Sequence, residues 1–258
     1  MKSLRSSRIM TAVLAFMILA LIALVVDTTV AFFTDARKSE NTFTAGNVYI
    51  DLSEAAVKSD GAGNLIEDET KERIHGEELT EGGSTVIHNY GFVFPGQNIY
   101  KDPTIRNTGK NEAWIAAKVV IEDGMGDIHR LFGYNEISDD IDIERLLTGG
   151  LLDEQVHVGD WNGISDVCHN ENYAMIQTSD RARGRYEFYF IMLKPFETDD
   201  EVMLFDGMFI NDLFGNGEML EFRDLRITVQ AYAVQEHGFS DCLSAMKGAF
   251  AEDFEGAR

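Results

Sequence analysis

The sequence has little proline, little cysteine and few basic residues. Its 258 residues include 3 prolines and 2 cysteines, and 22 Lys+Arg stand against 44 Asp+Glu, which gives a formal net charge of -22 at pH 7. This charge makes nucleic acid and anionic lipid surfaces poor partners, because both repel an acidic chain. With 45% apolar and 10% aromatic residues, the chain can bury a core and is not a disordered stalk. Its length suits one large domain or two small ones.

Motifs for catalysis and metal binding are also missing. The sequence contains no HExxH, HxxEH, GxSxG or P-loop pattern and no CxxC spacing, and its six histidines include no pair at i, i+4. We therefore predict no catalytic residue, no cofactor and no metal site. Acidic clusters at 67–69 and 139–144 could bind calcium, but they lack the alternating ligands and the turn glycine of an EF-hand loop. A solvated acidic face is the favoured interpretation.

The two cysteines, Cys168 and Cys242, leave two outcomes open. An exported chain could join them in a disulfide, provided that their Cα atoms come within bridging distance. Two buried thiols are the alternative, since burial is common for unpaired cysteine. The spacing along the chain does not decide between the two.

The N-terminus has the pattern of a secretory signal peptide. Three basic residues within the first eight positions precede residues 9–26, which carry no charge. Small side chains at Thr29 and Ala31 then suit a signal peptidase, so residues 1–31 are predicted to be removed by cleavage between Ala31 and Phe32. A retained membrane anchor is the alternative. It would tether the same exterior domain, residues 32–258, without changing its fold.

The cleavage prediction is tested by the intact mass of the exported protein. The mass is expected to correspond to a chain that starts at Phe32, because Thr29 and Ala31 supply the small residues that the peptidase requires. A membrane-bound protein that retains Met1 would contradict the prediction.

Alternating apolar residues predict a mainly β protein. Residues 47–52, 113–122 and 224–235 alternate apolar and polar side chains with a period of two, which is typical of half-buried strands. Residues 186–195 are apolar and aromatic at both sets of positions, which predicts a central strand covered on both sides. Strands of this kind favour an antiparallel β-sandwich, jelly-roll-like, with short helices and long loop insertions.

Several segments between these strands have other patterns. Residues 55–84 are polar and rich in glycine, which predicts a surface insertion with a short hairpin. Helical spacing occurs at 127–134 and 141–147, and residues 240–254 are predicted to form a C-terminal helix with Ser240 as its N-cap. Pro95-Gly96 predicts a turn before an edge-like strand. Residues 101–103, which include Pro103, are expected to interrupt the hydrogen-bond ladder of that strand, and a further turn is predicted at 107–109.

Four segments together resemble a known family. They are "AFFTD", "NTFTAGNVYIDL", "FPGQNIYKDPTIRNTGKNEAWIAAKVVI" and "ITVQAYAVQEHGF", in this order along the chain. Their order and spacing are similar to those of the TasA/camelysin family, whose members carry signal peptides processed by a SipW-type signal peptidase. The resemblance implies a jelly-roll-like sandwich in a secreted biofilm-matrix protein of Gram-positive bacteria that assembles into extracellular fibres. Residues 123–224 carry none of these motifs.

The residues exposed by signal cleavage suggest how such fibres would assemble. Phe32, Phe33, Thr34, Asp35 and Ala36 would form a free, extended end with large apolar side chains. We expect this donor segment to pair with the edge strand of a neighbouring copy, where backbone N–H and C=O groups are unpaired. Pairing with a sheet of its own subunit, as a first strand, is the alternative.

These observations rank three functions. The first is a fibre-forming structural protein of the extracellular matrix or cell surface, whose partners are further copies of itself, the SipW-type peptidase and other matrix proteins. The second is a camelysin-like surface metallopeptidase, to which the resemblance transfers no catalytic residue. The third is an adhesive surface-binding module.

Overall fold

The computed structural model describes residues 48–80, 83–88, 95–122, 146–180, 184–210, 212 and 225–257. The chain divides into two compact units, Met1–Ala45 and Gly46–Arg258, and every described residue belongs to the second. The predicted signal peptide, its cleavage point between Ala31 and Phe32, and the donor segment 32–36 therefore lie outside the described residues.

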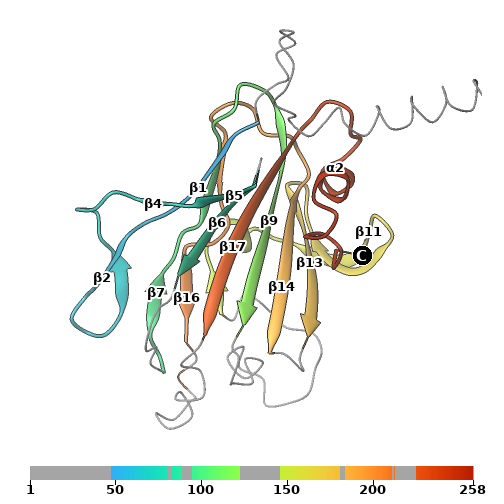
Figure 1. The fold of residues 1–258 in the computed structure, drawn as a ribbon. Coiled ribbons are helices and arrows are strands. Elements are labelled where there is room, and N and C mark those ends of the chain that lie inside the picture. Colours follow the sequence, from blue (N-terminus) through green and yellow to red (C-terminus); the bar gives the residue numbers. More distant parts are fainter. Residues whose placement is uncertain are drawn as a thin grey trace, which may run out of the picture. The chain divides into compact units, whose positions relative to one another are not determined.

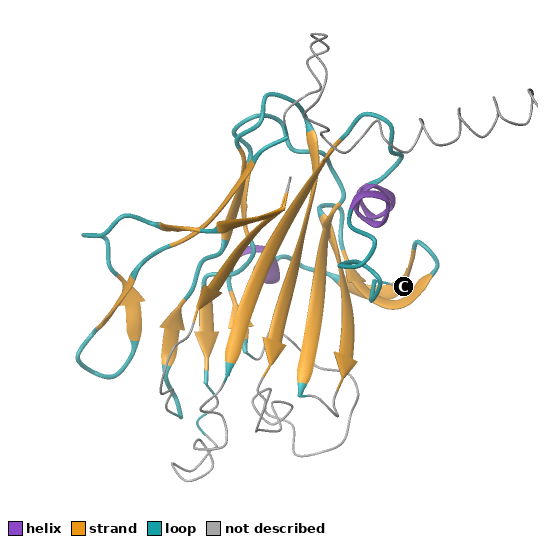
Figure 2. Cartoon of the chain, viewed as in Figure 1, coloured by secondary structure: helices purple, strands orange, loops and turns teal. Residues whose placement is uncertain are grey.

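Strands dominate the described residues (Figure 2). The first strands are β1 (Ile50–Glu54), β2 (Val57–Ser59), β3 (Leu65–Glu67), β4 (Ile74–His75), β5 (Glu77–Thr80), β6 (Gly83–His88), β7 (Asn98–Tyr100), β8 (Thr104–Asn107) and β9 (Ala113–Glu122). The later ones are β10 (Leu147–Thr148), β11 (His157–Trp161), β12 (Ile164–His169), β13 (Tyr173–Asp180), β14 (Arg185–Met192), β15 (Glu201–Met203), β16 (Gly207–Phe209) and β17 (Arg226–Gln235). A 3-10 helix, η3 (Gly150–Asp153), and an α-helix, α2 (Cys242–Ala249), complete the elements.

An eight-stranded antiparallel sheet forms one layer of the molecule. Its strand order is β11-β12-β13-β14-β9-β17-β6-β5, with the three longest pairings at β13–β14, β14–β9 and β9–β17 (Figure 1). Ile115, Ala117, Val119 and Ile121 of β9 lie on the face that packs into the main core. The strand is not half-buried as predicted, because its opposite face is buried as well. The predicted strand at 186–195 is β14, which lies between β13 and β9 and is covered on both faces, as predicted.

The second layer consists of two smaller sheets joined by continuous chain. The four-stranded order is β15-β8-β1-β4 and the five-stranded order is β10-β16-β7-β3-β2. Residues 101–103 connect β7 to β8, and residues 204–206 connect β15 to β16. At each of these two connections the chain passes from one small sheet to the other. The two connections bond to each other, with Leu204 N donating to Pro103 O at 3.0 Å and Lys101 N to Asp206 O at 3.2 Å. The predicted interruption at 101–103 is confirmed, but the strand is not at an edge, because β7 lies between β16 and β3 and β8 lies between β15 and β1.

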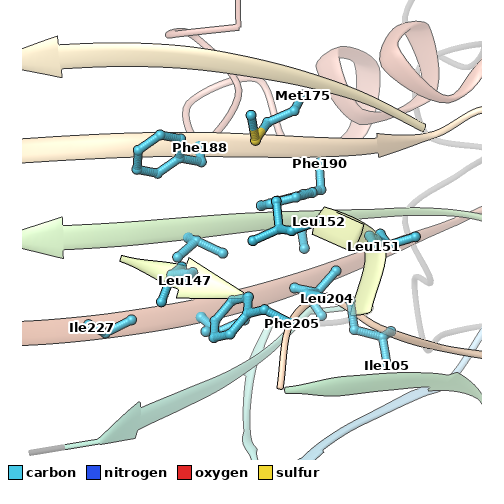
Figure 3. Close-up of a cluster of buried hydrophobic side chains, with 14 of the residues drawn as sticks. Ile105, Leu147, Leu151, Leu152, Met175, Phe188, Phe190, Leu204, Phe205 and Ile227 are labelled. Atoms are coloured by element: carbon cyan, nitrogen blue, oxygen red, sulfur yellow. The ribbon is translucent and has the colours of Figure 1, made fainter. Parts of the chain in front are cut away.

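The main core lies between the two layers. Side chains of the large sheet meet Leu52 of β1, Ile105 of β8 and Met208 of β16. Leu151 and Leu152 of η3 enter the same core, which Figure 3 shows together with the aromatic rings that β14 contributes. Burial of such side chains contributes about 1.5–3 kcal/mol each, which makes this core the main source of stability. The predicted antiparallel β-sandwich is confirmed.

The outer face of the large sheet has a cover of its own. Leu243 and Met246 of α2 pack with Ile191 and Tyr232 of the sheet, and Phe254 continues the cover beyond the helix. The predicted C-terminal helix therefore exists, but it spans Cys242–Ala249 rather than 240–254. Its N-cap is not Ser240, because the carboxylate of the following residue, Asp241, accepts the hydrogen bond from Ser244 N at 2.8 Å.

The predicted surface insertion at 55–84 is only partly an insertion. Strands β2 and β3 form the expected short hairpin, which extends from the sandwich in Figure 1. After the hairpin the chain returns to the sandwich, because β4 pairs with β1 and β5 pairs with β6. Gly76 makes this return possible, since a Cβ there would lie 2.4 Å from the hydroxyl of Ser84.

The predicted helices at 127–134 and 141–147 fall largely outside the described residues. Leu147 is described, and it belongs to β10 rather than to a helix, pairing with Met208 of β16. No helix in the described ranges is long and apolar enough to cross a membrane.

Candidate functional site

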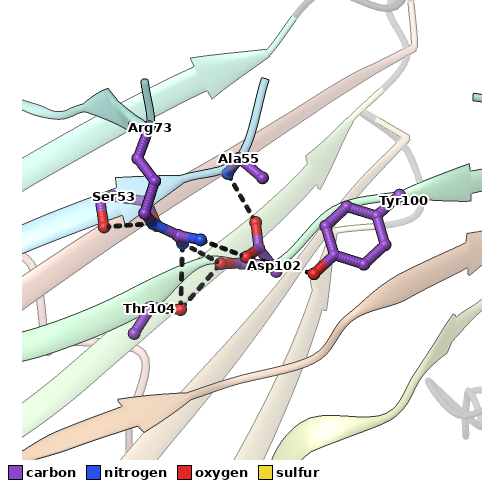
Figure 4. A network of polar contacts seen from close by, with 6 residues as sticks. All are labelled: Ser53, Ala55, Arg73, Tyr100, Asp102 and Thr104. Atoms are coloured by element: carbon purple, nitrogen blue, oxygen red, sulfur yellow. Dashed lines mark hydrogen bonds and ion pairs between the residues drawn. The ribbon is translucent and has the colours of Figure 1, made fainter. Parts of the chain in front are cut away.

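A buried network of ion pairs lies at residues 101–103, the bend between β7 and β8 where the chain passes from one small sheet to the other. Its central residue is Asp102, which the interruption between β7 and β8 turns inward, so that only 4% of its side chain is exposed. One carboxylate oxygen accepts a hydrogen bond from Ala55 N at 2.7 Å, and the other accepts one from Nη1 of Arg73 at 2.6 Å (Figure 4). The carboxylate therefore joins the residue after β1, the residue before β4 and the bend.

The guanidinium of Arg73 makes several further hydrogen bonds. It donates to Ser53 Oγ at 3.0 Å, to Ser53 O at 3.1 Å, to Asp102 O at 3.1 Å and to Thr104 Oγ1 at 3.2 Å. A planar fork with five donors suits this arrangement, whereas the single point charge of a lysine does not. Arg73, the residue before β4, is thus attached to β1, to the β7–β8 connection and to the start of β8.

A second ion pair, Lys101 with Glu54, lies beside the first and is more deeply buried. Their side chains are 0% and 1% exposed, and the ammonium of Lys101 donates to Oε1 of Glu54. Burial lowers the pKa of Lys101, and the charges of Glu54 and Asp102 oppose that shift. Two charged groups at a buried site that excludes water stay ionised only while they remain paired with each other.

The same bend shifts the pKa values of two more groups. Burial raises the pKa of Asp206, and the nearby carboxylates of Asp153 and Asp102 raise it further. Burial, followed by the charge of Asp102, raises the pKa of Tyr100 to about 12. Both shifts arise because acidic groups lie together where water is partly excluded.

Replacing Asp206 with asparagine is expected to stabilise the fold near neutral pH. The folded-state pKa of Asp206 is raised, so its ionised form opposes folding, and that penalty applies above the folded-state pKa. The gain in the free energy of unfolding should shrink as the pH falls toward 3.8, the ordinary pKa of an aspartate side chain. Urea denaturation at a series of pH values measures it. A gain in Asp206→Asn that does not vary with pH would contradict the prediction.

The chemical role of this network is to fasten segments together. The carboxylates of Asp102 and Glu54 and the cations of Arg73 and Lys101 are each held by a group from another segment. Within the described ranges, no group of three or more His, Cys, Asp or Glu side chains is arranged to hold a metal ion. Sequence reasoning placed Lys101 and Asp102 only as an interruption and missed Glu54 and Arg73. The sequence signal for a buried ion pair was Glu54, an acidic residue directly after the alternating apolar residues of a predicted strand.

A second polar network lies on the outer face of the large sheet. Glu187 of β14 lies 3.2 Å from Nζ of Lys118 and 2.8 Å from Nε of Arg185, and Arg185 also pairs with Glu122 at 2.9 Å. Lys118 donates in addition to the backbone oxygen of Asp253 at 3.3 Å. This network joins neighbouring strands and holds the C-terminal segment on the sheet.

The two cysteines are not joined by a disulfide. Cys242, at the start of α2, packs into the outer-face cluster and donates through Sγ to Ile115 O at 3.2 Å. Cys168 of β12 packs against the main core on the opposite face of the same sheet. A sheet separates the two thiols, so the pairing that the sequence left open does not form in this structure.

The native protein is expected to react with a thiol reagent at Cys168 before Cys242. Burial raises the pKa of the Cys242 thiol, and only the thiolate is nucleophilic. Both cysteines should react in concentrated guanidinium chloride without prior reduction, which a colorimetric thiol assay measures. A lack of reaction until a reductant is added would show a disulfide and contradict the structure.

The ends of the large sheet are described surfaces that offer backbone groups to another chain. β5 and β11 are its terminal strands, each hydrogen-bonded to one neighbour in the sheet. Both carry a register shift, between Glu78 and Thr80 in β5 and between Gly159 and Trp161 in β11. Such irregularities limit uncontrolled edge pairing. In β11, Val158 is 64% exposed.

Comparison of the chain with protein-family models, with curated proteins and with solved structures finds no match. The donor segment and the signal cleavage point, which sequence reasoning selected, lie outside the described residues. The edges at β5 and β11 are two of the described surfaces where such a segment could pair.

Proposed function

We propose that this chain is a secreted structural protein of the extracellular matrix that forms fibres by donating its N-terminal segment to the next copy. One observation carries the proposal: the eight-stranded sheet ends in strands at both sides, β5 and β11. A terminal strand offers a row of backbone N–H and C=O groups to an incoming extended segment. The donor segment, Phe32 to Ala36, has the length and alternation to act as that strand.

The resemblance to the TasA/camelysin family supports the same function. The segments that carry it include β1, the run from β7 to β9, and β17. β1 pairs with β8, and β9 pairs with β17, so the resembling segments are neighbours within each layer. Segments distant in sequence thus contribute paired strands to both layers of the sandwich, and one of them includes the bend between β7 and β8.

The acidic charge is consistent with assembly outside the cell. A net charge of -22 keeps separate copies soluble through mutual repulsion, so association needs a specific contact to outweigh it. Main-chain pairing along a donor strand, with phenylalanine burial, supplies such a contact without opposite charges. Assembly should therefore become easier as added salt screens the repulsion.

Electron microscopy of the purified exported chain at rising concentration tests the proposed function. Filaments are expected to appear without any added partner, and at a lower protein concentration when the salt concentration is raised. Monomers that persist at high concentration and cleave a protein substrate would overturn the proposal in favour of the metallopeptidase. Monomers that bind a glycan or a host protein saturably would overturn it in favour of the adhesin.

A further inference from the structure

Two histidines meet on hairpin β11–β12 at the edge of the large sheet. His157 and His169 are direct register partners across the two antiparallel strands. Their ring centroids are 3.9 Å apart, with an angle of 63° between the ring planes. His157 is exposed and His169 is half-buried, so the pair is open to solvent on one side.

The turn of the hairpin sets this register. Asn162 and Gly163 connect the strands with φ values of 50° and 80°, the positive values that a two-residue type I′ turn requires. Trp161 and Ile164 flank the turn as partners, and the register shift before Trp161 brings His157 opposite His169 at the far end of the hairpin. Directly opposed residues project from the same face of an antiparallel pair. The backbone therefore brings the two imidazoles together.

We propose that His157 and His169 bind a divalent transition-metal ion, Cu²⁺ most tightly. A metal–nitrogen bond to imidazole is about 2.0–2.1 Å long, so two rings on one ion lie roughly 1 Å further apart than these two do. Rotation of the side chains at the exposed edge supplies that movement while the backbone stays in place. The two rings form a chelate that spans both strands.

The ligand set favours copper over zinc. Structural zinc sites are four-coordinate with protein side chains, whereas the described residues group no third His, Cys, Asp or Glu with this pair. Cu²⁺ accepts a tetragonal arrangement of nitrogen and water ligands, and it binds nitrogen sites more strongly than Ni²⁺ or Zn²⁺. Water would fill its remaining positions on the solvent side.

Binding would join β11 to β12, its neighbour among the described strands of the sheet. β11 carries a register shift, and its valine, Val158, is exposed. A chelate across both strands would fix their register at the end opposite the turn. This proposal does not depend on fibre formation, because the ligands belong to one copy.

Titration of the exported protein with copper chloride, followed by calorimetry and electron paramagnetic resonance, tests the site. One tight equivalent per chain with two coordinated nitrogens is expected, and each of His157→Asn and His169→Asn should lower the affinity at least about tenfold, since either variant removes the chelate. His237→Asn, a change at an exposed histidine just after β17, is the matched control and should bind as the parent does.

Three results would overturn the proposal. They are unchanged copper affinity in both His157→Asn and His169→Asn, equal losses in all three variants, and a spectrum with a single coordinated nitrogen. Circular dichroism of each variant, recorded without metal, establishes that a loss of affinity comes from the missing ligand rather than from unfolding. If asparagine at either position unfolds the hairpin, His157→Gln and His169→Gln replace those variants with a side chain of similar size.

Discussion

Deletion of residues 32–36 is expected to abolish filaments and to leave a folded, soluble monomer with unchanged circular dichroism. Each phenylalanine that docks on a neighbouring copy could contribute about 1.5–3 kcal/mol through apolar burial. Backbone pairing along Thr34 to Ala36 would add to that contribution. Together these contributions exceed the entropic cost of ordering a short segment, so they determine whether copies associate at micromolar concentration. Electron microscopy and light scattering of the purified variant measure the result.

Single substitutions within the donor segment provide a sharper comparison. In an extended segment, Phe32, Thr34 and Ala36 face one way, and Phe33 and Asp35 face the other. Phe32→Ser should therefore reduce assembly more than Phe33→Ser, because Phe33 shares its face with a charge. Filaments of normal length from the deleted protein would rule out donor-strand assembly. An unfolded deletion product would instead show that the segment is a strand of its own subunit.

Replacement of Glu54 with alanine is expected to destabilise the folded protein by about 3–5 kcal/mol. The change removes the ion-pair partner of Lys101, whose side chain is 0% exposed, and leaves a cation in a place with little water. Denaturation by guanidinium chloride measures the loss. Because small domains are stable by only about 5–15 kcal/mol, the variant is expected to be near its unfolding limit.

A double substitution and an exposed ion pair serve as controls. Glu54→Leu combined with Lys101→Met fills the same space without charge, and it should recover most of the stability, since apolar replacements of buried pairs are often neutral or better. Arg106→Gln, in the neighbouring strand β8, breaks a pair with Asp199 whose side chains are 47% and 68% exposed. It should cost less than about 1 kcal/mol. Equal losses in Glu54→Ala and Arg106→Gln would contradict the argument from burial.

The proposed copper site illustrates a limit of reading motifs along the chain. Metal motifs such as paired histidines at i, i+4 report residues that one helix brings together. His157 and His169 are brought together by a hairpin, where the distance along the sequence depends on the turn and on an irregularity in one strand. The Asn-Gly pair at 162–163 was a local signal for that hairpin. The register shift next to it was not predictable from residue types.

The strands of the sandwich were largely determined by the sequence itself. Alternation in β9 and β17 assigns one face to the main core, because successive side chains of a strand point in opposite directions. The doubly apolar pattern of β14 likewise predicts its central place. The turn at Pro95-Gly96 could also be predicted, because turn residues act locally. The same holds for Pro103, which has no N–H to donate to a hydrogen-bond ladder.

The tertiary structure alone decided which distant groups meet. Arg73 lies beside Asp102, and Lys101 beside Glu54, because the chain changes sheet where β7 passes into β8 and β8 then pairs with β1. Cys168 and Cys242 remain apart because the large sheet lies between them, although either outcome was compatible with the sequence. Alternation specifies the face of a strand, whereas contacts between faces depend on how the sheets stack, twist and connect.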